Sequence, residues 1–399
     1  MSLVFYPKSL TEIKMFTKNI IQNLQQQHTP FYYYDLGLLQ KTLEAITHES
    51  TKYNYHVHYA LKANANTELL QIIKKAGLGA DCVSGNEVRC AIENGFAPSK
   101  IVFAGVGKSD EEINYALSQN IFCFNCESFQ ELDVINELAA KQNKLASIAL
   151  RINPNVDAHT HKYITTGLEE NKFGINPYEF DAVIEKIKQL NRIKLIGLHF
   201  HIGSQITDLN PFRQLCVKVN QINTFFFEKG FDLPIINVGG GVGINYKEPD
   251  KESIIDFAAY FKVFKDFIVL RKNQELHFEL GRAVVAQCGS LISRVLYIKN
   301  GINTNFAILD AGMTELIRPA LYQAYHKIEN LSALQNNLPN NKRYDVVGPI
   351  CESSDCFGKA VELPETKRGD LIAIRSAGAY GEVMSSRYNL RDITRAVYS

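Results

Sequence analysis

Short apolar segments alternate with longer amphipathic segments between about residue 55 and residue 282. The apolar segments are YHVHYALK, GADCV, KIVFAG, NIFCFNC, ASIALRI, IKLIGLHFHIG, PIINVGGG and LHFELGR. Apolar residues recur at helical spacing in the segments between them, as in TELLQIIKKAG, SFQELDVINELAAKQ and PYEFDAVIEKIKQL. Because a (β/α)8 barrel requires eight strands separated by helices, the pattern predicts an α/β fold with such a barrel. An open, doubly wound sheet is the alternative, since periodicity does not show closure.

The pattern changes after residue 282. The later segments SLISRVLYIKN, TNFAILDAG, KRYDVVGPI and DLIAIRSAGAY are short strands with turn residues between them and no comparable helices. They predict a second, mostly antiparallel β domain, either a barrel or a sandwich. We therefore expect three parts: residues 1–33 joining the β domain, residues 34–282 forming the barrel, and residues 283–399 forming the β domain.

Composition and charge narrow the possible partners. The chain has 399 residues, 46% of them hydrophobic, and its 43 basic and 42 acidic residues are mixed along the sequence, for a net charge of +1. This balance favours neither nucleic acid nor a membrane surface as a partner. Charged residues such as Lys8 and Glu12 interrupt the N-terminal segment, and no apolar run has the length of a signal peptide or a membrane span. We expect a cytoplasmic protein.

The eight cysteines predict neither a disulfide framework nor a metal site. Cys123 and Cys126 form a C-x-x-C motif without a second pair, so we interpret them as buried strand residues. His159 and His161 have no third ligand at suitable spacing and are interpreted as loop residues. No metal is predicted.

Candidate chemistry stands at the ends of the predicted strands, where the active site of a barrel lies. Lys62 ends the first strand, His199 and His201 the sixth, Gly239-Gly240-Gly241 the seventh, and Glu279 to Arg282 the eighth. Consecutive glycines let backbone N–H groups approach phosphate oxygens closely, and a fixed cation such as Arg282 suits phosphate or carboxylate. A phosphate site is thereby indicated.

Lys62 follows a buried apolar strand, where a lysine is costly unless it is paired, exposed or chemically used. A lysine that forms an imine beside a phosphate site is typical of pyridoxal 5′-phosphate (PLP) chemistry. We therefore predict an enzyme with PLP as its cofactor and an amino acid as its small-molecule substrate.

Six motifs carry a resemblance to a known family. YALKANAN, HFHIGSQ, GGGVGI, ELGR, RPALY and CESSD, with a late AGAYG, stand in the order and spacing of the fold-type III PLP-dependent decarboxylases. The resemblance runs from about residue 30 to the end. It is strongest to the members that convert meso-2,6-diaminopimelate to L-lysine and CO₂, the last step of lysine biosynthesis.

The resemblance implies roles for residues of the barrel. Lys62 would hold PLP as a Schiff base, Glu279 would pair with the pyridine nitrogen, and His201 would stack on the ring with Asp81 as an orienting partner. The phosphate would be bound by Ser204, Gly239, Gly240, Gly241, Gly281 and Arg282. The role of His199 stays open.

The resemblance also implies roles for residues of the β domain. Arg318 and Tyr322 would bind substrate, and Tyr380 would contact substrate or cofactor. Cys351 would be catalytic and would return a proton to Cα, while Glu352 would bind the distal ammonium of the substrate. In the family these last two residues act across a homodimer interface, so we expect a homodimer with shared active sites.

The charges of the predicted site favour meso-diaminopimelate. This substrate carries both an ammonium and a carboxylate at its far end, and Glu352 with Arg282 and Arg318 offers the matching set of charges.

Three other functions are alternatives to this one. A polyamine-pathway decarboxylase acting on ornithine, arginine or carboxynorspermidine is the nearest alternative. An amino-acid racemase would need a tyrosine base opposite the lysine, and a PLP-carrier protein would lack the β domain.

Overall fold

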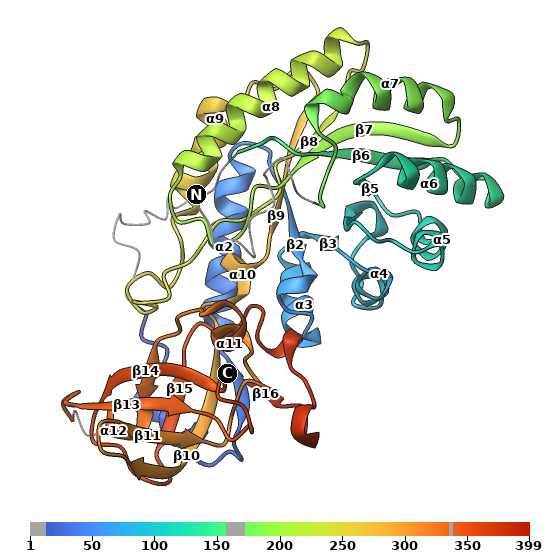
Figure 1. Ribbon diagram of the computed structural model, residues 1–399. Coiled ribbons are helices and arrows are strands. Elements are labelled where there is room, and N and C mark those ends of the chain that lie inside the picture. Colours follow the sequence, from blue (N-terminus) through green and yellow to red (C-terminus); the bar gives the residue numbers. More distant parts are fainter. Residues whose placement is uncertain (1–12, 157–171, 335–337) are drawn as a thin grey trace. The chain divides into compact units, whose positions relative to one another are not determined.

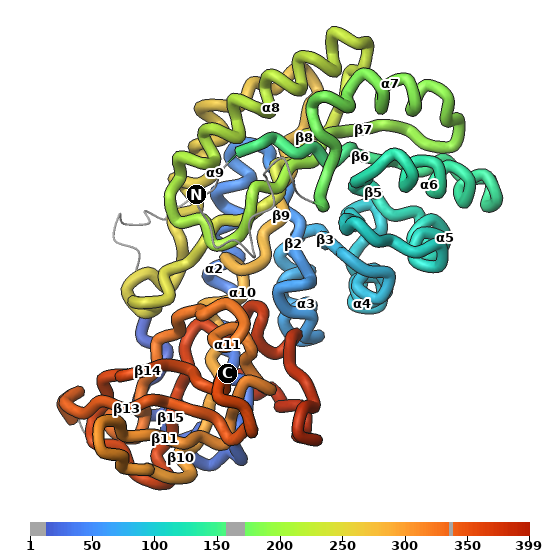
Figure 2. The backbone as a smooth tube through the Cα atoms, in the orientation of Figure 1, coloured from blue at the N-terminus to red at the C-terminus, as the bar shows by residue number. Residues whose placement is uncertain are grey.

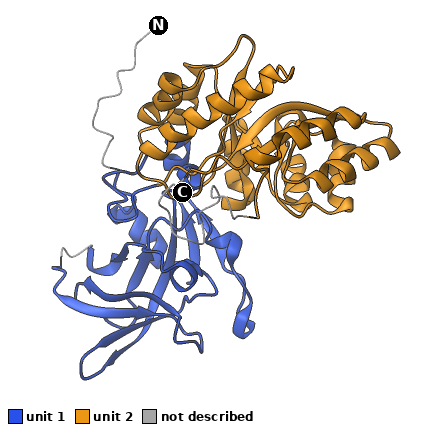
Figure 3. Ribbon diagram, turned by 45° about the horizontal axis from the view of Figure 1, so that its top comes forward, with its two compact units in different colours: residues 1–42, 244–255, 282–399 blue, residues 43–243, 256–281 orange. Residues whose placement is uncertain are grey.

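The computed structural model describes residues 13–156, 172–334 and 338–399. The chain divides into two compact units, which are coloured in Figure 3. The smaller unit comprises Met1–Thr42, Ile244–Ile255 and Arg282–Ser399, and the larger comprises Leu43–Gly243 and Asp256–Gly281.

The larger unit is a closed barrel of eight parallel strands. These strands are β2 (His56–Ala60), β3 (Gly79–Cys82), β4 (Ile101–Phe103), β5 (Cys123–Cys126), β6 (Ala146–Ile152), β7 (Ile193–Phe200), β8 (Ile235–Asn237) and β9 (Glu275–Leu280). Closure comes from pairing between the first and last strands, in which Val57 stands opposite Phe278. The predicted barrel is confirmed, and the open sheet is excluded.

One helix precedes the first barrel strand and the others follow strands, and the helices lie outside the strands (Figure 1). They are α2 (Leu36–Thr51), α3 (Thr67–Lys75), α4 (Gly85–Glu93), α5 (Asp110–Gln119), α6 (Phe129–Lys141), α7 (Phe180–Gln189), α8 (Asn210–Glu228) and α9 (Phe257–Phe267), with 3₁₀ turns at Leu61–Ala63, Pro98–Lys100 and Pro177–Glu179. Side-chain caps define where several of them begin. Ser109 and Glu112 form a reciprocal capping box at the start of α5, for example.

Small and branched apolar side chains form a buried cluster within the barrel unit. Val102, Cys123, Ala149, Ile196 and Ile235 pack together, each from a different strand. Cys123 and Cys126 are buried on β5, which confirms their interpretation as strand residues. His159 and His161 lie outside the described residues.

The smaller unit is a mostly antiparallel β structure. Its strands are β1 (Phe31–Tyr34), β10 (Gly289–Asn300), β11 (Asn305–Leu309), β12 (Ile328–Asn330), β13 (Lys342–Val347), β14 (Cys356–Leu363), β15 (Leu371–Ile374) and β16 (Arg395–Tyr398). Its helical segments are short: α1 (Lys18–Gln25), α10 (Arg282–Val285), α11 (Arg318–Tyr322), α12 (Leu331–Leu334), and 3₁₀ turns at Glu382–Met384 and Tyr388–Leu390.

Strand β1 joins this unit although it precedes the barrel in sequence. Phe31–Tyr34 pairs antiparallel with β10 and parallel with β16. Figure 2 shows the blue N-terminal segment among the orange and red strands of the later chain. A second parallel pair, β11 with β13, interrupts the antiparallel order.

Among the residues that the structure describes, no helix is both long and apolar enough to cross a membrane.

Candidate functional site

A buried carboxylate lies among polar side chains at the C-terminal ends of the barrel strands. Oε2 of Glu279 on β9 is 2.9 Å from Nε2 of His199 on β7. Its Oε1 accepts hydrogen bonds from the amide of Asn125 at 3.1 Å and from the amide of Asn237 at 2.8 Å. Because a carboxylate only accepts, Nε2 of His199 carries a proton.

The surroundings of Glu279 favour its charged form. Burial raises the pKa of this carboxyl, but the charge and hydrogen bond of His199, together with the charge of Lys62, outweigh burial and hold the pKa below its usual value. The barrel therefore presents an ionised carboxylate that is shielded from water and held by three side chains.

Lys62 lies two residues beyond the end of β2, in the 3₁₀ turn Leu61–Ala63. Its Nζ is 2.9 Å from Oδ2 of Asp81 on β3; the Asp81 side chain is fully buried, and the Lys62 side chain is 37% exposed. Burial and the charge of Glu279 raise the pKa of Asp81, and Lys62 opposes this. Asp81 thus has Lys62 as a partner, and its role as an orienting partner of His201 stays a prediction.

The glycine segment after β8 is packed against neighbouring backbone. A Cβ at Gly240 would overlap with the carbonyl oxygen of Glu279, and Gly239 and Gly241 have φ angles of +67° and +104°. The N–H of Gly239 donates to Oδ1 of Asn237 at 2.9 Å. Only glycine tolerates these backbone conformations and close contacts. They bring backbone N–H groups beside the end of the strand that carries Glu279.

His201 follows β7 and lies next to this glycine segment. Its Nδ1 accepts the N–H of Gly240 at 3.5 Å, so the ring is oriented from the backbone. Burial and the positive charge of Arg151 lower the pKa of His201 well below its usual value, which keeps the imidazole neutral. Ser204, three residues further on, is half-buried.

Sequence reasoning missed three polar residues of the barrel. Asn125 and Asn237 hold Glu279, and Arg151 on β6 forms a buried ion pair with Glu127 at 2.8 Å. Each of the three stands near the C-terminal end of an otherwise apolar strand. A polar residue at such a position is the signal that would have found them.

In the smaller unit, one tyrosine hydroxyl holds two buried arginines. The hydroxyl oxygen of Tyr246 accepts from Arg282 at 2.6 Å and from Arg318 at 2.9 Å. The guanidinium carbon of Arg282 also lies 4.8 Å from the centroid of the Tyr380 ring. The arrangement brings two fixed cations together, as a carboxylate or phosphate ligand requires.

His326 orients Arg318 from behind. Nδ1 of His326 is 2.8 Å from the carbonyl oxygen of Arg375, which can only accept, so Nδ1 carries the proton. Nε2 therefore accepts from Arg318, also at 2.8 Å. Burial and the charge of Arg318 lower the pKa of His326 to about 3, so the ring is neutral. Tyr246 and His326 were not among the residues predicted from sequence.

The remaining predicted residues of the smaller unit are more accessible. Tyr322, at the end of α11, is half-buried. Cys351 and Glu352 are exposed. The N–H of Cys351 donates to Asn389 at 3.3 Å, and Glu352 accepts from the hydroxyl of Tyr388 at 2.6 Å.

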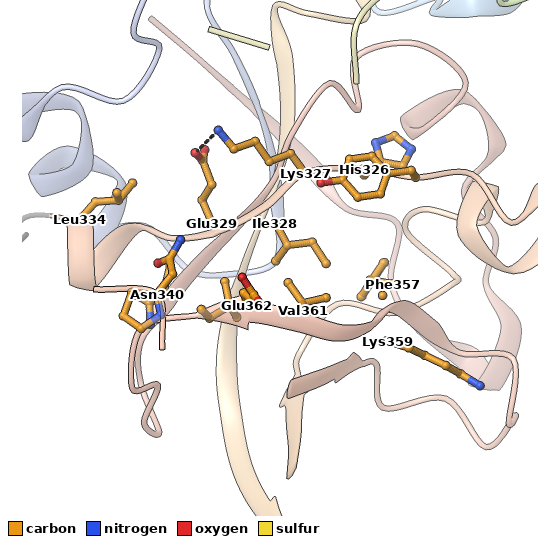
Figure 4. Close-up of a pocket in the computed structure, with 15 residues that line it drawn as sticks. His326, Lys327, Ile328, Glu329, Leu334, Asn340, Phe357, Lys359, Val361 and Glu362 are labelled. Carbon is orange, nitrogen blue, oxygen red and sulfur yellow. Dashed lines mark ion pairs between the residues drawn. The ribbon is translucent and has the colours of Figure 1, made fainter. Parts of the chain in front are cut away.

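A cavity of about 470 Å³ in the smaller unit also reaches His326. Figure 4 shows its lining, which comes mainly from β12 and β14 and includes the ion pair between Lys327 and Glu329. The predicted site residues do not line this cavity. We therefore do not assign the chemistry to it.

The side chains of the barrel fit PLP. Lys62 supplies an amine, Glu279 an ionised carboxylate suited to a protonated ring nitrogen, and His201 a neutral ring. The glycine segment supplies backbone N–H groups where no side chain can intrude.

Comparison with known proteins agrees with this donor set. Residues 36–286 match the family model "Pyridoxal-dependent decarboxylase, pyridoxal binding domain". The chain is 58% identical over 380 residues to diaminopimelate decarboxylase of Bacteroides thetaiotaomicron, covering 95% of this chain and 97% of the relative.

Solved structures are similar along nearly the whole chain. The crystal structure of diaminopimelate decarboxylase from Helicobacter pylori complexed with L-lysine has a TM-score of 0.88 and 40% identity, covering 95% of this chain and 93% of the other. The arginine decarboxylase of Paramecium bursaria Chlorella virus has a TM-score of 0.82 and 22% identity, covering 96% of this chain and all of the other. This second likeness shows a shared fold alone.

Proposed function

Because the chain belongs to the diaminopimelate decarboxylases, a family of pyridoxal-dependent enzymes, we propose that its predicted site residues serve that reaction in the roles argued below. The protein is a PLP-dependent enzyme that decarboxylates meso-2,6-diaminopimelate to L-lysine and CO₂. The observation that best supports the proposed roles is the ionised Glu279, held by His199, Asn125 and Asn237 in the same barrel as Lys62.

The barrel residues hold and polarise the cofactor. When bound, PLP supplies an electron-accepting ring that stabilises the negative charge left at Cα by loss of CO₂. Glu279 holds a proton on the ring nitrogen, and His199 with the two amides keeps Glu279 charged. Lys62 anchors the cofactor through its amine, and Asp81 positions that amine. His201 orients the ring, while Ser204, Gly239, Gly240, Gly241, Gly281 and Arg282 bind the phosphate, and Arg282 also serves the substrate.

Two arginines select diaminopimelate by its distal carboxylate. Arg282 and Arg318 are both buried and share the Tyr246 hydroxyl, so their charges are concentrated on a small surface. Ornithine, lysine and arginine have no carboxylate at the far end and would leave these cations without a partner, which disfavours them. Tyr322 and Tyr380 complete the substrate contacts.

Cys351 and Glu352 act from a second copy of the chain. Both are exposed on the smaller unit, as residues offered to a partner must be. Cys351 returns a proton to Cα after decarboxylation, and Glu352 binds the distal ammonium. We therefore propose a cytoplasmic homodimer with shared active sites, without nucleic-acid or membrane partners, built from the three parts 1–33, 34–282 and 283–399.

Two measurements test this proposal. Borohydride reduction of the PLP-loaded enzyme should attach the cofactor to Lys62, as mapped by peptide mass; attachment to another lysine would overturn the assigned anchor. A panel of amino acids should then release CO₂ and the decarboxylated amine efficiently only from meso-diaminopimelate. Equal turnover of ornithine or arginine would contradict the role of the arginines, and interconversion of enantiomers without CO₂ would indicate a racemase.

A further inference from the structure

A second cluster of chemically active side chains lies at the N-terminal ends of β2 and β9, opposite the strand ends that carry the candidate site. It consists of His56 on β2 with Glu275 and His277 on β9, and His56 stands opposite His277 in the register that closes the barrel. Oε2 of Glu275 is 3.6 Å from Nε2 of His56 and 3.4 Å from Nε2 of His277.

Hydrogen bonds determine which nitrogen of His277 carries its proton. Nδ1 of His58 is 3.1 Å from the carbonyl oxygen of Lys100, which only accepts, so Nδ1 is protonated. His58 is buried, and its two hydrogen bonds are to this carbonyl oxygen and to a second imidazole, so Nε2 of the neutral ring is an acceptor. Nδ1 of His277, 2.9 Å from that nitrogen, must then donate to it.

This arrangement leaves a lone pair on Nε2 of His277 facing a carboxylate oxygen. Two acceptors 3.4 Å apart repel each other unless a proton or a metal ion lies between them. Nε2 of His56 and Nε2 of His277 both lie within 3.6 Å of the same carboxylate oxygen, an arrangement of two nitrogens and one oxygen that a single ion can share. A bound cation resolves the conflict and uses His58 and the Lys100 carbonyl as the outer partners that orient metal-binding histidines.

We propose that His56, Glu275 and His277 bind a divalent transition-metal ion of the zinc type. Two histidines and one carboxylate are a common zinc ligand set, with water in the fourth position. Ligand atoms about 2.0–2.1 Å from a tetrahedral ion are separated by roughly 3.3–3.5 Å. The two separations at Glu275 are close to this value, and the three ligand atoms all lie within 4.8 Å of one another.

Access and position indicate what the ion would do. The side chains of His56 and Glu275 are 43% and 46% exposed, so an ion can enter and His56 can rotate toward it, while His277 is only 5% exposed and fixed. The ion would join the first and last strands where they close the barrel, and would stabilise that closure. The proposal departs from the expectation that the protein binds no metal, because His56 stands more than 200 residues before Glu275 and His277 and the sequence does not show that they meet.

Zinc titration of the chelator-treated, PLP-loaded enzyme tests the site. Calorimetry should show one zinc ion per chain, and the thermal unfolding midpoint should rise with zinc concentration. His56→Gln and Glu275→Gln should each weaken binding at least about tenfold and abolish the thermal shift, without changing kcat. The two residues are exposed, so loss of folding is not expected.

A matched control separates this site from incidental surface binding. His48, exposed on α2, lies 3.0 Å from the carboxylate of Glu49, and His48→Gln should leave zinc affinity and the thermal shift unchanged. Failure of the wild-type enzyme to bind one equivalent would overturn the proposal. So would unchanged affinity in both His56→Gln and Glu275→Gln, which would place the zinc elsewhere.

Discussion

Nε2 of His199 lies 2.9 Å from Oε2 of Glu279, both side chains being almost fully buried. Through this contact His199, whose role is open from the sequence, keeps a buried carboxylate charged. Glu279→Gln should therefore lower kcat at least about a hundredfold, on the order of 3 kcal/mol of transition-state stabilisation, because a neutral amide cannot hold the proton on the cofactor nitrogen. PLP affinity, measured by fluorescence titration, should change much less.

The control for this prediction is Asp370→Asn. Asp370 is a buried carboxyl of the smaller unit that accepts hydrogen bonds from Asn330 and from the N–H of Lys367. Its loss should reduce stability while leaving kcat nearly unchanged. If Glu279→Gln turned over like the wild type, Glu279 would be structural and the proposed cofactor orientation wrong.

Removing the hydrogen-bond acceptor behind Arg318 should weaken substrate binding. His326→Phe deletes the acceptor 2.8 Å from the guanidinium, and a hydrogen bond to a charged group contributes about 1.5–3 kcal/mol. We expect KM for diaminopimelate to rise roughly ten- to a hundredfold, with kcat changed only a few-fold.

Rescue distinguishes positioning from a general loss of structure. His326→Gln can still accept from Arg318 and donate to the Arg375 carbonyl, so it should restore most of the lost affinity. A fall in kcat with KM unchanged in His326→Phe would contradict the assignment of Arg318 to the substrate carboxylate.

Mixing two inactive variants tests the shared active site. Lys62→Ala and Cys351→Ala homodimers should both be strongly impaired, because each lacks one half of every site. After subunit exchange, half the dimers are mixed and each mixed dimer has one intact site of two, so activity should recover to about a quarter of the wild type. The measurement is CO₂ release after confirmed exchange. If Cys351 serves its own barrel, mixing restores nothing.

Titration of Glu87 should make the stability of the protein depend on pH. Burial raises the pKa of this carboxyl to about 7, although the N–H of Val83 opposes the rise. A raised carboxyl pKa means that the folded state binds more protons than the unfolded state between about pH 4.5 and 7, so stability falls as pH rises through this window. In Glu87→Gln that loss should disappear.

Urea unfolding at pH 5 and pH 8 measures this effect. From pH 5 to pH 8, the free energy of unfolding of Glu87→Gln should rise by on the order of 1 kcal/mol relative to that of the wild type. The figure is reduced because the side chain is only partly buried. The glutamine oxygen can still accept from Val83, so the helix start should be preserved. An identical pH profile in both proteins would show that Glu87 titrates normally.

The architecture and the reaction follow from the order of the residues. Eight apolar segments of strand length, separated by helical spacing, predict a barrel, and the ends of parallel strands must meet at one edge. Lys62, His201, Gly239 and Glu279 could thus be grouped from the sequence alone, because each directly follows or ends a predicted strand. The motifs around them then indicate PLP and decarboxylation.

Features that depend on pairing between distant segments emerge only in the folded chain. Closure by β2 and β9, the hold of Asn125 and Asn237 on Glu279, and the shared Tyr246 hydroxyl all join residues dozens to hundreds of positions apart. Periodicity reports which face of a strand or helix is buried, and it carries no information about which polar side chain meets which. The proton positions on His326, His58 and His277 also follow only from their partners. For that reason the partner of Asp81 and the cluster at His56 could be identified only from the tertiary structure.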